Sequence, residues 1–430
     1  MPAQLPSSLR PLPAALFALS TLSAGSATAA TFTVSNCADS GAGSLRQAVI
    51  NANGAAGADT ITFAVSCSPI TLTSGQLTIT DSVTITGPGA AALTVSGNNA
   101  SRIFEINGSG ITVGISGLTI TGGNDGPGGG ILITTASAIN IDSVVVTGNT
   151  SSDDGGGIYH TNYGGLLTLT NSTISNNSAG ADGGGVNLYS SAVIRNTTIS
   201  GNTAQSAGGG LVAYLDNPGT TLLIENSTIS GNTKTTASRA GGGMRISTDN
   251  PGNSVTIRDS TIVNNTSSTT GGGISAYQPY LNLTITNTVI AGNSAASGTP
   301  DLDRISASPQ VLNVTYSLVQ GGGGAINGAN VGNIFGVPAG LGPLANNGGP
   351  TLTQLPLPGS PVINAGDPAF VPPPATDQRG QPRVQGGRID IGSVEVGSFV
   401  VPTLSAWVLG LLAAAMAFLG ARVTRRRTRA

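Results

Sequence analysis

The chain has 430 residues, of which 64 are glycine, 8% are charged and one is histidine, and its formal net charge is −2. A nucleic-acid-binding protein needs a basic stripe that neutralises phosphates, and this weakly charged sequence does not provide one. The length suffices for one elongated domain with small flanking modules.

The first 30 residues have the organisation of an export signal. Arg10 precedes the apolar run 14–22, and Ala27-Thr28-Ala29 supplies small residues for cleavage. We predict that residues 1–30 direct export and do not belong to the fold. Cys37 and Cys67 can form a disulfide outside the cytoplasm, and we expect them to pair.

Residues 31–100 are assigned to an N-terminal cap and the first coils of a repeat. Within them, residues 43–53 (GSLRQAVINAN) predict a short amphipathic helix with Ser44 near its N-cap. Because an open solenoid end exposes a strand edge, we expect this helix to plug that end.

A repeat occupies residues 101–320. Gly-Gly-Gly occurs six times between residues 128 and 273 at spacings of 25 to 33 residues, the length of one solenoid coil. Between triplets, alternating apolar residues lead to Asn, Asp or Ser, then to another apolar residue and a second Asn. One unit reads Leu167, Leu169, Asn171, Ile174, Asn177.

This pattern predicts an all-β fold, a right-handed parallel β-helix with three short strands per coil. Alternation with period two indicates strands with one buried face, and the phase change at the first Asn marks a corner. Coils of such a solenoid stack about 4.8 Å apart. We therefore expect the corner asparagines to form a ladder in which each amide bonds the next: Asn171, Asn196, Asn226 and Asn287.

Together with the Gly-Gly-Gly units, the segments 44–48 and 57–63 resemble bacterial surface proteins of the pectin-lyase-like superfamily. The superfamily includes polysaccharide lyases and hydrolases, so activity has to be judged from residues rather than fold. The paired carboxylates and Gly-His-Gly of polygalacturonase-like hydrolysis are mostly missing. His160, the one histidine, falls at an inward-facing position and is expected to be packed rather than catalytic.

An acidic cluster is the best candidate for a metal site. Asp154 and Asp182 each precede a Gly triplet and are expected to stack on adjacent coils, with Asp153 beside them. Oxygen ligands this close suit Ca²⁺. The alternative is solvated turn carboxylates, because no repeating Gly-Gly-x-Gly-x-Asp motif accompanies them.

Tyrosines gather in the segments between each Gly triplet and the next strand, at positions that should point outward. An exposed row of rings with polar neighbours could stack on sugar rings, which predicts a glycan-binding strip. The alternative is aromatic stacking that rigidifies this edge. The strip consists of Tyr159, Asn187, Tyr189, Tyr214, Arg245 and Tyr277.

Residues 321–397 form a second, Pro- and Gly-rich module. Its segment 342–395 resembles the choice-of-anchor Q domain, which accompanies C-terminal surface-attachment signals. Asp377, Arg379 and Asp390 invite a catalytic interpretation, but we expect them to pin turns through salt bridges.

The C-terminus predicts membrane insertion. The apolar segment Leu404 to Ala421 is about long enough to cross a bilayer, and the basic tail 422–430 should stay in the cytoplasm. Residues 401–407 resemble the Ile-Pro-Thr-Leu sorting signal of Gram-negative bacteria, although Val401 replaces Ile. That resemblance implies processing by an exosortase-type membrane protease. It rests on Val401, Pro402, Thr403, Leu404 and Trp407.

The sequence thus predicts an exported surface or matrix protein of a Gram-negative bacterium, held at least transiently in the inner membrane. We expect a structural or adhesive role without catalysis. Its expected partners are the processing protease, the membrane and extracellular polysaccharide. The alternative is a polysaccharide lyase or glycoside hydrolase that acts along the β-helix edge.

Overall fold

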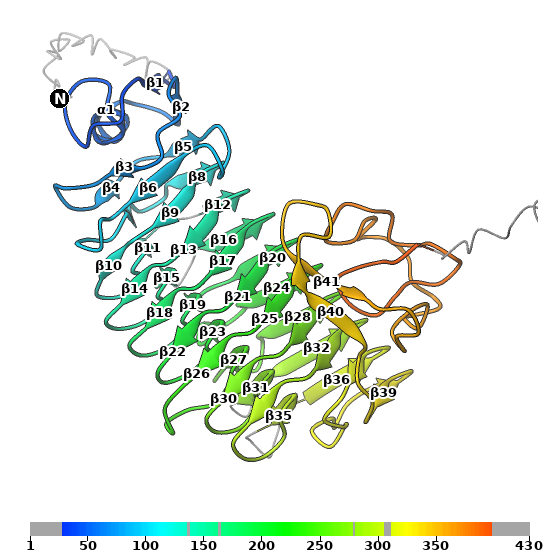
Figure 1. Cartoon of the computed structure of the whole chain (residues 1–430). Helices are drawn as coiled ribbons and strands as arrows, with labels where there is room; N and C mark the ends of the chain where they lie inside the picture. The colour runs from blue at the N-terminus through cyan, green and yellow to red at the C-terminus, as the bar shows by residue number, and fades with distance from the viewer. Residues whose placement is uncertain (1–27, 136–137, 162–164, 278–279, 305–310, 398–430) are drawn as a thin grey trace, which may run out of the picture.

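The computed structural model describes residues 28–135, 138–161, 165–277, 280–304 and 311–397. They form a long stack of coils, capped at one end by a single helix and flanked near the other end by a C-terminal module (Figure 1). Strands of successive coils pair in parallel and in register, as Ile139 with Leu167 and Ile141 with Leu169. The prediction of an all-β parallel β-helix is confirmed.

Sheet 1 carries the first strand of each coil and has 12 strands among the described residues. They are β1 (Thr31–Val34), β2 (Asp59–Phe63), β5 (Val83–Thr86), β8 (Thr112–Ser116), β12 (Ala138–Asp142), β16 (Leu166–Thr170), β20 (Ala192–Arg195), β24 (Thr221–Glu225), β28 (Ser254–Arg258), β32 (Asn282–Thr286), β36 (Val311–Thr315) and β38 (Asn330–Val331).

Sheet 2 follows after the corner and has 11 strands within the same described ranges. They are β3 (Ile70–Thr71), β6 (Thr94–Ser96), β9 (Thr119–Thr121), β13 (Val145–Thr147), β17 (Thr173–Ser175), β21 (Thr198–Ser200), β25 (Thr228–Ser230), β29 (Thr261–Val263), β33 (Val289–Ala291), β37 (Leu318–Val319) and β39 (Ile334–Phe335).

Sheet 3 follows the Gly triplets and has nine strands in the part of the chain that the structure describes. They are β4 (Leu77–Ile79), β7 (Phe104–Asn107), β11 (Ile131–Thr135), β15 (Ile158–His160), β19 (Val186–Leu188), β23 (Leu211–Tyr214), β27 (Met244–Ser247), β31 (Ile274–Tyr277) and β35 (Leu302–Arg304).

A fourth sheet of two-residue strands lies between sheets 2 and 3 in chain order, where only three strands per coil were expected. The sequence did not indicate it, because two residues are too few to show a period. Its strands are β10 (Asn124–Asp125), β14 (Thr150–Ser151), β18 (Ser178–Ala179), β22 (Thr203–Ala204), β26 (Thr233–Lys234), β30 (Thr266–Ser267) and β34 (Ser294–Ala295).

The corner between sheets 1 and 2 has left-handed backbone at each repeat, with φ of 49° at Asn171 and 51° at Asp259. Asn and Asp tolerate this region better than other non-glycine residues, so the predicted bend is confirmed. The predicted ladder is wrong beyond its first step. Asn196 donates to Asn171 at 3.2 Å, but Asn226 and Asn287 bond the C-terminal module instead.

The continuous amide ladder is the second asparagine column, at the next corner. Each Nδ2 donates to the next Oδ1, for example from Asn202 to Asn232 at 3.0 Å and from Asn232 to Asn265 at 2.9 Å. These side chains are inside the coil, away from water, so each amide needs a partner in the neighbouring coil. The column runs through Asn149, Asn177, Asn202, Asn232, Asn265 and Asn293.

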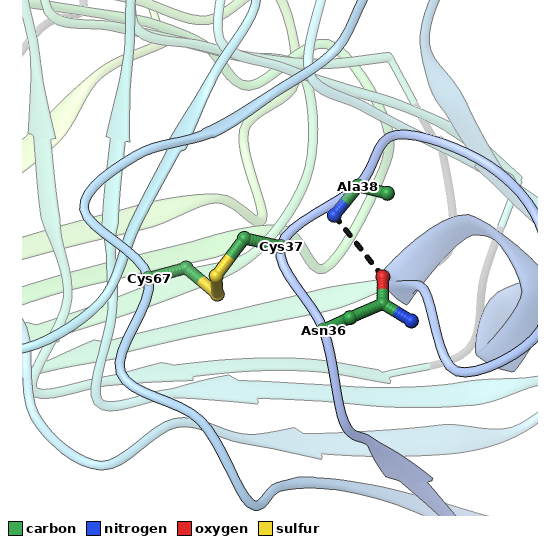
Figure 2. Close-up of a disulfide and its surroundings, with 4 residues drawn as sticks. All are labelled: Asn36, Cys37, Ala38 and Cys67. Carbon is green, nitrogen blue, oxygen red and sulfur yellow. Dashed lines mark hydrogen bonds between the residues drawn. A yellow bond between two sulfur atoms is a disulfide. The ribbon is translucent and has the colours of Figure 1, made fainter.

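The N-terminal end is closed by α1 (Leu45–Gly54), and Ser44 Oγ accepts from the amide of Gln47 as the predicted N-cap. Its apolar residues Leu45, Ala48, Val49 and Ala52 are buried, and the helix packs against β1, β2 and β4. Figure 1 shows the helix at the N-terminal end of the stack. Cys37 and Cys67 are disulfide-bonded with a Cα–Cα distance of 5.6 Å, which confirms the predicted pairing. In Figure 2 this bond joins the segment after β1 to the segment before β3.

The C-terminal module folds back over the outer face of sheet 2 and contains the hairpin of β40 (Leu341–Ala345) and β41 (Thr353–Pro356) (Figure 1). An apolar cluster joins the two parts and includes Val263, Val289 and Val362. Asp377 and Arg379 form the expected ion pair at 2.8 Å. Asp390 instead accepts backbone N–H bonds from residues 364 and 396.

The predicted export signal, except for its last three residues, lies outside the described part of the chain. So do the sorting motif, the apolar segment 404–421 and the basic tail. Within residues 28–397, the described helix is too short to span a bilayer.

Candidate functional site

A surface groove with a volume of about 520 Å³ lies on the outer side of sheet 3, beside β23, β27 and β31. Two tyrosine rings and two guanidinium groups contribute to its walls, and two carboxylates stand at its exposed edge. The lining includes Tyr214, Asp216, Arg239, Arg245, Asp249 and Tyr277.

The predicted tyrosine strip is assembled, but as a stack whose rings are half-buried. The ring centroids of Tyr159 and Tyr189 are 5.9 Å apart edge to face, and those of Tyr189 and Tyr214 are 5.2 Å apart. Farther along, Arg245 lies over the ring of Tyr277 at 4.3 Å. The rings thus stiffen this face, as the alternative interpretation held, while Tyr214 and Tyr277 also line the groove.

Two members of the strip are not exposed as predicted. Asn187 is fully buried and Arg245 is 6% exposed, although both occupy outward-pointing positions. The cause is the first glycine of each triplet, whose positive φ folds the turn back over the second residue of the strand. A Cβ built on Gly183 would lie 2.8 Å from the Cβ of Asn187. Asn187 is therefore beneath the surface and cannot touch a ligand.

A hydrogen-bonded cluster stands at one end of the groove. Tyr214 donates its hydroxyl to Asp182 Oδ2 at 2.6 Å, and Arg239 Nη1 donates to the same oxygen at 2.5 Å. Burial, followed by the charge of Asp182, raises the pKa of the Tyr214 hydroxyl. Tyr214 therefore stays protonated, with its ring held in one orientation.

Arg239 was not predicted as a groove residue, although the sequence contains a signal for it. It lies in the eight-residue segment 233–240, where the following repeat has only the five residues 266–270. Lys234 organises this insertion by donating to Thr269 Oγ1 at 3.0 Å and to the carbonyl of Thr236. Burial, with a contribution from the charge of Arg245, lowers the pKa of Lys234 to about 8.

The predicted Ca²⁺ cluster is not formed as a metal site. Arg239 occupies Asp182 Oδ2, and Asp154 Oδ1 accepts the backbone N–H of Asp182 at 2.9 Å. Burial raises the pKa of Asp154 to about 6, whereas Asp153 lies at the surface. Throughout the described ranges, no three His, Cys, Asp or Glu side chains are grouped to hold a metal ion. A guanidinium stands where the cation was expected.

His160 lies inside the coil, as predicted. It is fully buried, and Ser190 Oγ lies 3.1 Å from its Nδ1. Burial lowers the pKa of His160 to about 4, so the ring is neutral near pH 7. Its place in the core separates it from the groove.

The two carboxylates of the groove are the groups that sequence reasoning did not single out. Asp216 and Asp249 are both exposed and lie close enough to influence each other. Burial and then the charge of Asp249 raise the pKa of Asp216. Chemically, the groove combines aromatic faces, a guanidinium floor and an acidic edge.

Two family models match the chain. Residues 129–324 match the model described as the right handed beta helix region, and residues 401–427 match the IPTL-CTERM motif. No curated protein matches. The right-handed, pectin-lyase-like β-helix and the sorting signal are thus confirmed, and the sorting motif implies an exported protein. Residues 342–395 lie outside both matches, so the resemblance to choice-of-anchor Q stays a prediction.

Proposed function

We propose that this exported, C-terminally sorted β-helix protein is a surface adhesin that binds extracellular polysaccharide in the groove on sheet 3 and catalyses no reaction. In this proposal, an exosortase-type protease processes the sorting motif after the apolar segment has entered the membrane. The match to residues 401–427 supports the sorting step.

The composition of the groove is the observation that carries the adhesive role. Tyr214 and Tyr277 line it together with Arg239 and Arg245, and the opening reaches across more than one coil. Aromatic rings stack on the apolar faces of sugars, and nearby polar groups bond the hydroxyls. An opening that spans more than one coil and has both features suits a chain of sugars better than a small metabolite.

The arrangement of titratable groups favours binding over catalysis. The histidine is in the core, and Asp182 is held by Tyr214 and Arg239. A hydrolase or lyase needs at least two titratable groups that converge on one bond of the substrate. Asp182 is engaged in a way that suits a rigid binding surface.

One observation favours the alternative of a polysaccharide lyase or hydrolase. Asp216 and Asp249 are neighbours in the groove, and the pKa of Asp216 is raised, as expected for a general acid. Incubating the full chain with polysaccharides and measuring reducing ends and unsaturated products tests this alternative. Turnover that is lost in Asp216→Asn would replace the adhesive proposal.

The adhesive proposal is tested with the full chain, purified in mild detergent, on a glycan array. Binding should weaken in Tyr214→Ala, because the ring is lost, and should survive better in Tyr214→Phe, because the ring is kept. Tyr280→Ala serves as the control, since Tyr280 is exposed and does not line the groove. If no glycan binds, or if Tyr214→Ala binds like the wild type, the groove is not the binding site.

A further inference from the structure

Arg245 forms no ion pair with a carboxylate within the described structure, and Asp182 acts on it only as a charge nearby. Its side chain makes no hydrogen bond or ion pair with any described residue, and Nε is buried without a partner. Desolvation lowers its pKa, which shows that the burial disfavours its charge. A buried guanidinium usually has a carboxylate beside it, because an unpaired charge away from water is costly.

The repeat itself does not require an arginine at this position. The residues paired with Arg245 on the neighbouring strands are Val212 and Ser275, and both are fully buried. A small apolar or hydroxyl side chain therefore fits the equivalent position in the neighbouring coils. Packing within the coil does not explain why this position holds an arginine.

Arg245 is also held in place at the groove. Its guanidinium lies 4.3 Å from the ring centroid of Tyr277, and both side chains line the opening. Stacking on an aromatic ring leaves the N–H groups of a guanidinium free to bond in its plane. A planar carboxylate or a sulfate matches that donor arrangement.

The edge of the groove limits which anionic ligand fits. Asp216 and Asp249 are exposed there and line the same opening. A chain with an acidic group on every sugar would bring its next charges toward these carboxylates, and like charges repel. A chain whose acidic sugars alternate with neutral ones avoids that repulsion.

We propose that the groove binds a polysaccharide whose acidic groups are separated by neutral sugars, and that Arg245 receives one of its oxyanions. This inference rests on the proposed glycan binding and specifies its ligand class. The ring of Tyr277 holds the guanidinium, Tyr214 stacks on a sugar, and the acidic edge faces the neutral sugars.

The test compares three polymers by titration against the full chain: hyaluronan with alternating charges, polygalacturonate with contiguous charges, and neutral dextran. We expect hyaluronan to bind at least tenfold more tightly than either of the others. Arg245→Gln should abolish this preference, and Arg245→Lys should restore part of it. Arg195→Gln is the matched control, because Arg195 pairs with Glu225 on sheet 1.

Each result decides the matter. Equal binding of dextran and hyaluronan, or an unchanged preference in Arg245→Gln, overturns the inference while the adhesive function stands. Absence of binding to these polymers and to the array overturns both. If Arg245→Gln does not fold, the salt dependence of hyaluronan binding by the wild type is measured in place of the variant. Affinity for hyaluronan should fall steeply with added salt, and an affinity independent of salt rules out the charge recognition.

Discussion

At the scale of single residues, we expect the short ion pair between Arg239 and Asp182 to contribute little to stability. Arg239 contacts Asp182 at 2.5 Å, but its side chain is 52% exposed. Exposed ion pairs contribute about 0 to 1 kcal/mol. We therefore expect Arg239→Ala to lower the free energy of unfolding by about 1 kcal/mol or less, as measured by urea denaturation.

The same change should reduce glycan binding, because Tyr214 Oη loses its 2.5 Å contact with Arg239 and the ring is held less firmly. A loss of several kcal/mol in stability would contradict this assignment. It would mean that the insertion 233–240 depends on Arg239 rather than on Lys234.

Sequence reasoning placed some of the groove residues and not others, for identifiable reasons. Tyr214 and Tyr277 follow from their position in the repeat, since equivalent residues stack from coil to coil. Asn187 was misplaced because period-two alternation shows which side a residue faces, not whether that side is open to water. Arg239 was missed because the path of its insertion depends on contacts of Lys234 with the next coil.

At the scale of elements, the buried asparagine ladder should contribute more to stability than its regular pattern suggests. Asn232 Oδ1 accepts from the backbone and side-chain nitrogens of Asn202, and its Nδ2 donates to Asn265 and to the Ile199 carbonyl. Asn232→Ala removes these four bonds from the interior and leaves the backbone N–H of Asn202 without its acceptor, whereas the amides of Asn202 and Asn265 each keep one other bond. A buried polar group left unpaired costs about 1 to 3 kcal/mol, and the lost bonds of the other groups add to this. We expect a total loss of about 3 to 5 kcal/mol in urea unfolding.

Asn140→Ala is the matched control for this prediction. Asn140 is exposed on β12, so water can take the place of its amide as a hydrogen-bond partner. The free energy of unfolding should therefore change by no more than about 0.5 kcal/mol. Equal effects of the two substitutions would show that the ladder does not hold the coils together.

The N-terminal cap allows a second prediction for an element, because the disulfide closes a loop with a sequence separation of 30. Loop-closure entropy for this length corresponds to about 3 to 4 kcal/mol. Since each coil of a solenoid contacts only its neighbours, the loss should be local. Reducing the bond, or replacing Cys37 by Ser and Cys67 by Ala, should speed hydrogen exchange in β1, α1 and β3. Exchange at β27 should not change, and a uniform increase along the chain would refute this local picture.

At the scale of the whole molecule, the C-terminal module crosses four successive coils of similar sequence, and one ion pair distinguishes them. The corner residues beneath the module are Asn196, Asn226, Asp259 and Asn287. Asp259 is the carboxylate of this set, and Arg383 bonds it at 2.9 Å with both side chains fully buried. A buried pair is weak evidence for added stability, but it can fix register. This pair is a charged contact that differs among the four coils beneath the module, so it suits a role in fixing the coil on which the module docks.

The fold of the solenoid could thus be predicted from its repeat, whereas the docking of the module could not. Gln378 bonds Thr228 Oγ1 at 2.7 Å across a separation of 150 residues. The module has no repeat of its own that would indicate such partners. The burial of the corner residues between sheets 1 and 2 could not be predicted either, because the module is what covers them.

The last prediction concerns how pH acts on this docking. Burial, with a contribution from the charge of Asp390, raises the pKa of Glu395 from 4.5 to about 8. Between pH 4.5 and about 8, Glu395 therefore keeps its proton in the folded module, whereas it has lost the proton in the unfolded chain. The stability contributed by Glu395 is complete below pH 4.5 and is lost as the pH rises toward 8. Calorimetry of the full chain should show the module unfolding at a lower temperature at pH 8 than at pH 5.

Glu395→Gln should remove most of this pH dependence. In the wild type, Glu395 Oε2 accepts the N–H of Asp390 at 2.8 Å, and Oε1 accepts the N–H of Gln385 at 3.3 Å. The amide oxygen of the glutamine can keep the first bond, while the second and weaker bond is lost. Glu105→Gln, on β7 at the other end of the solenoid, should behave like the wild type. If Glu395→Gln keeps the full pH dependence, another acid of the module must carry it. Asp390 is then the first to test, because burial also raises its pKa.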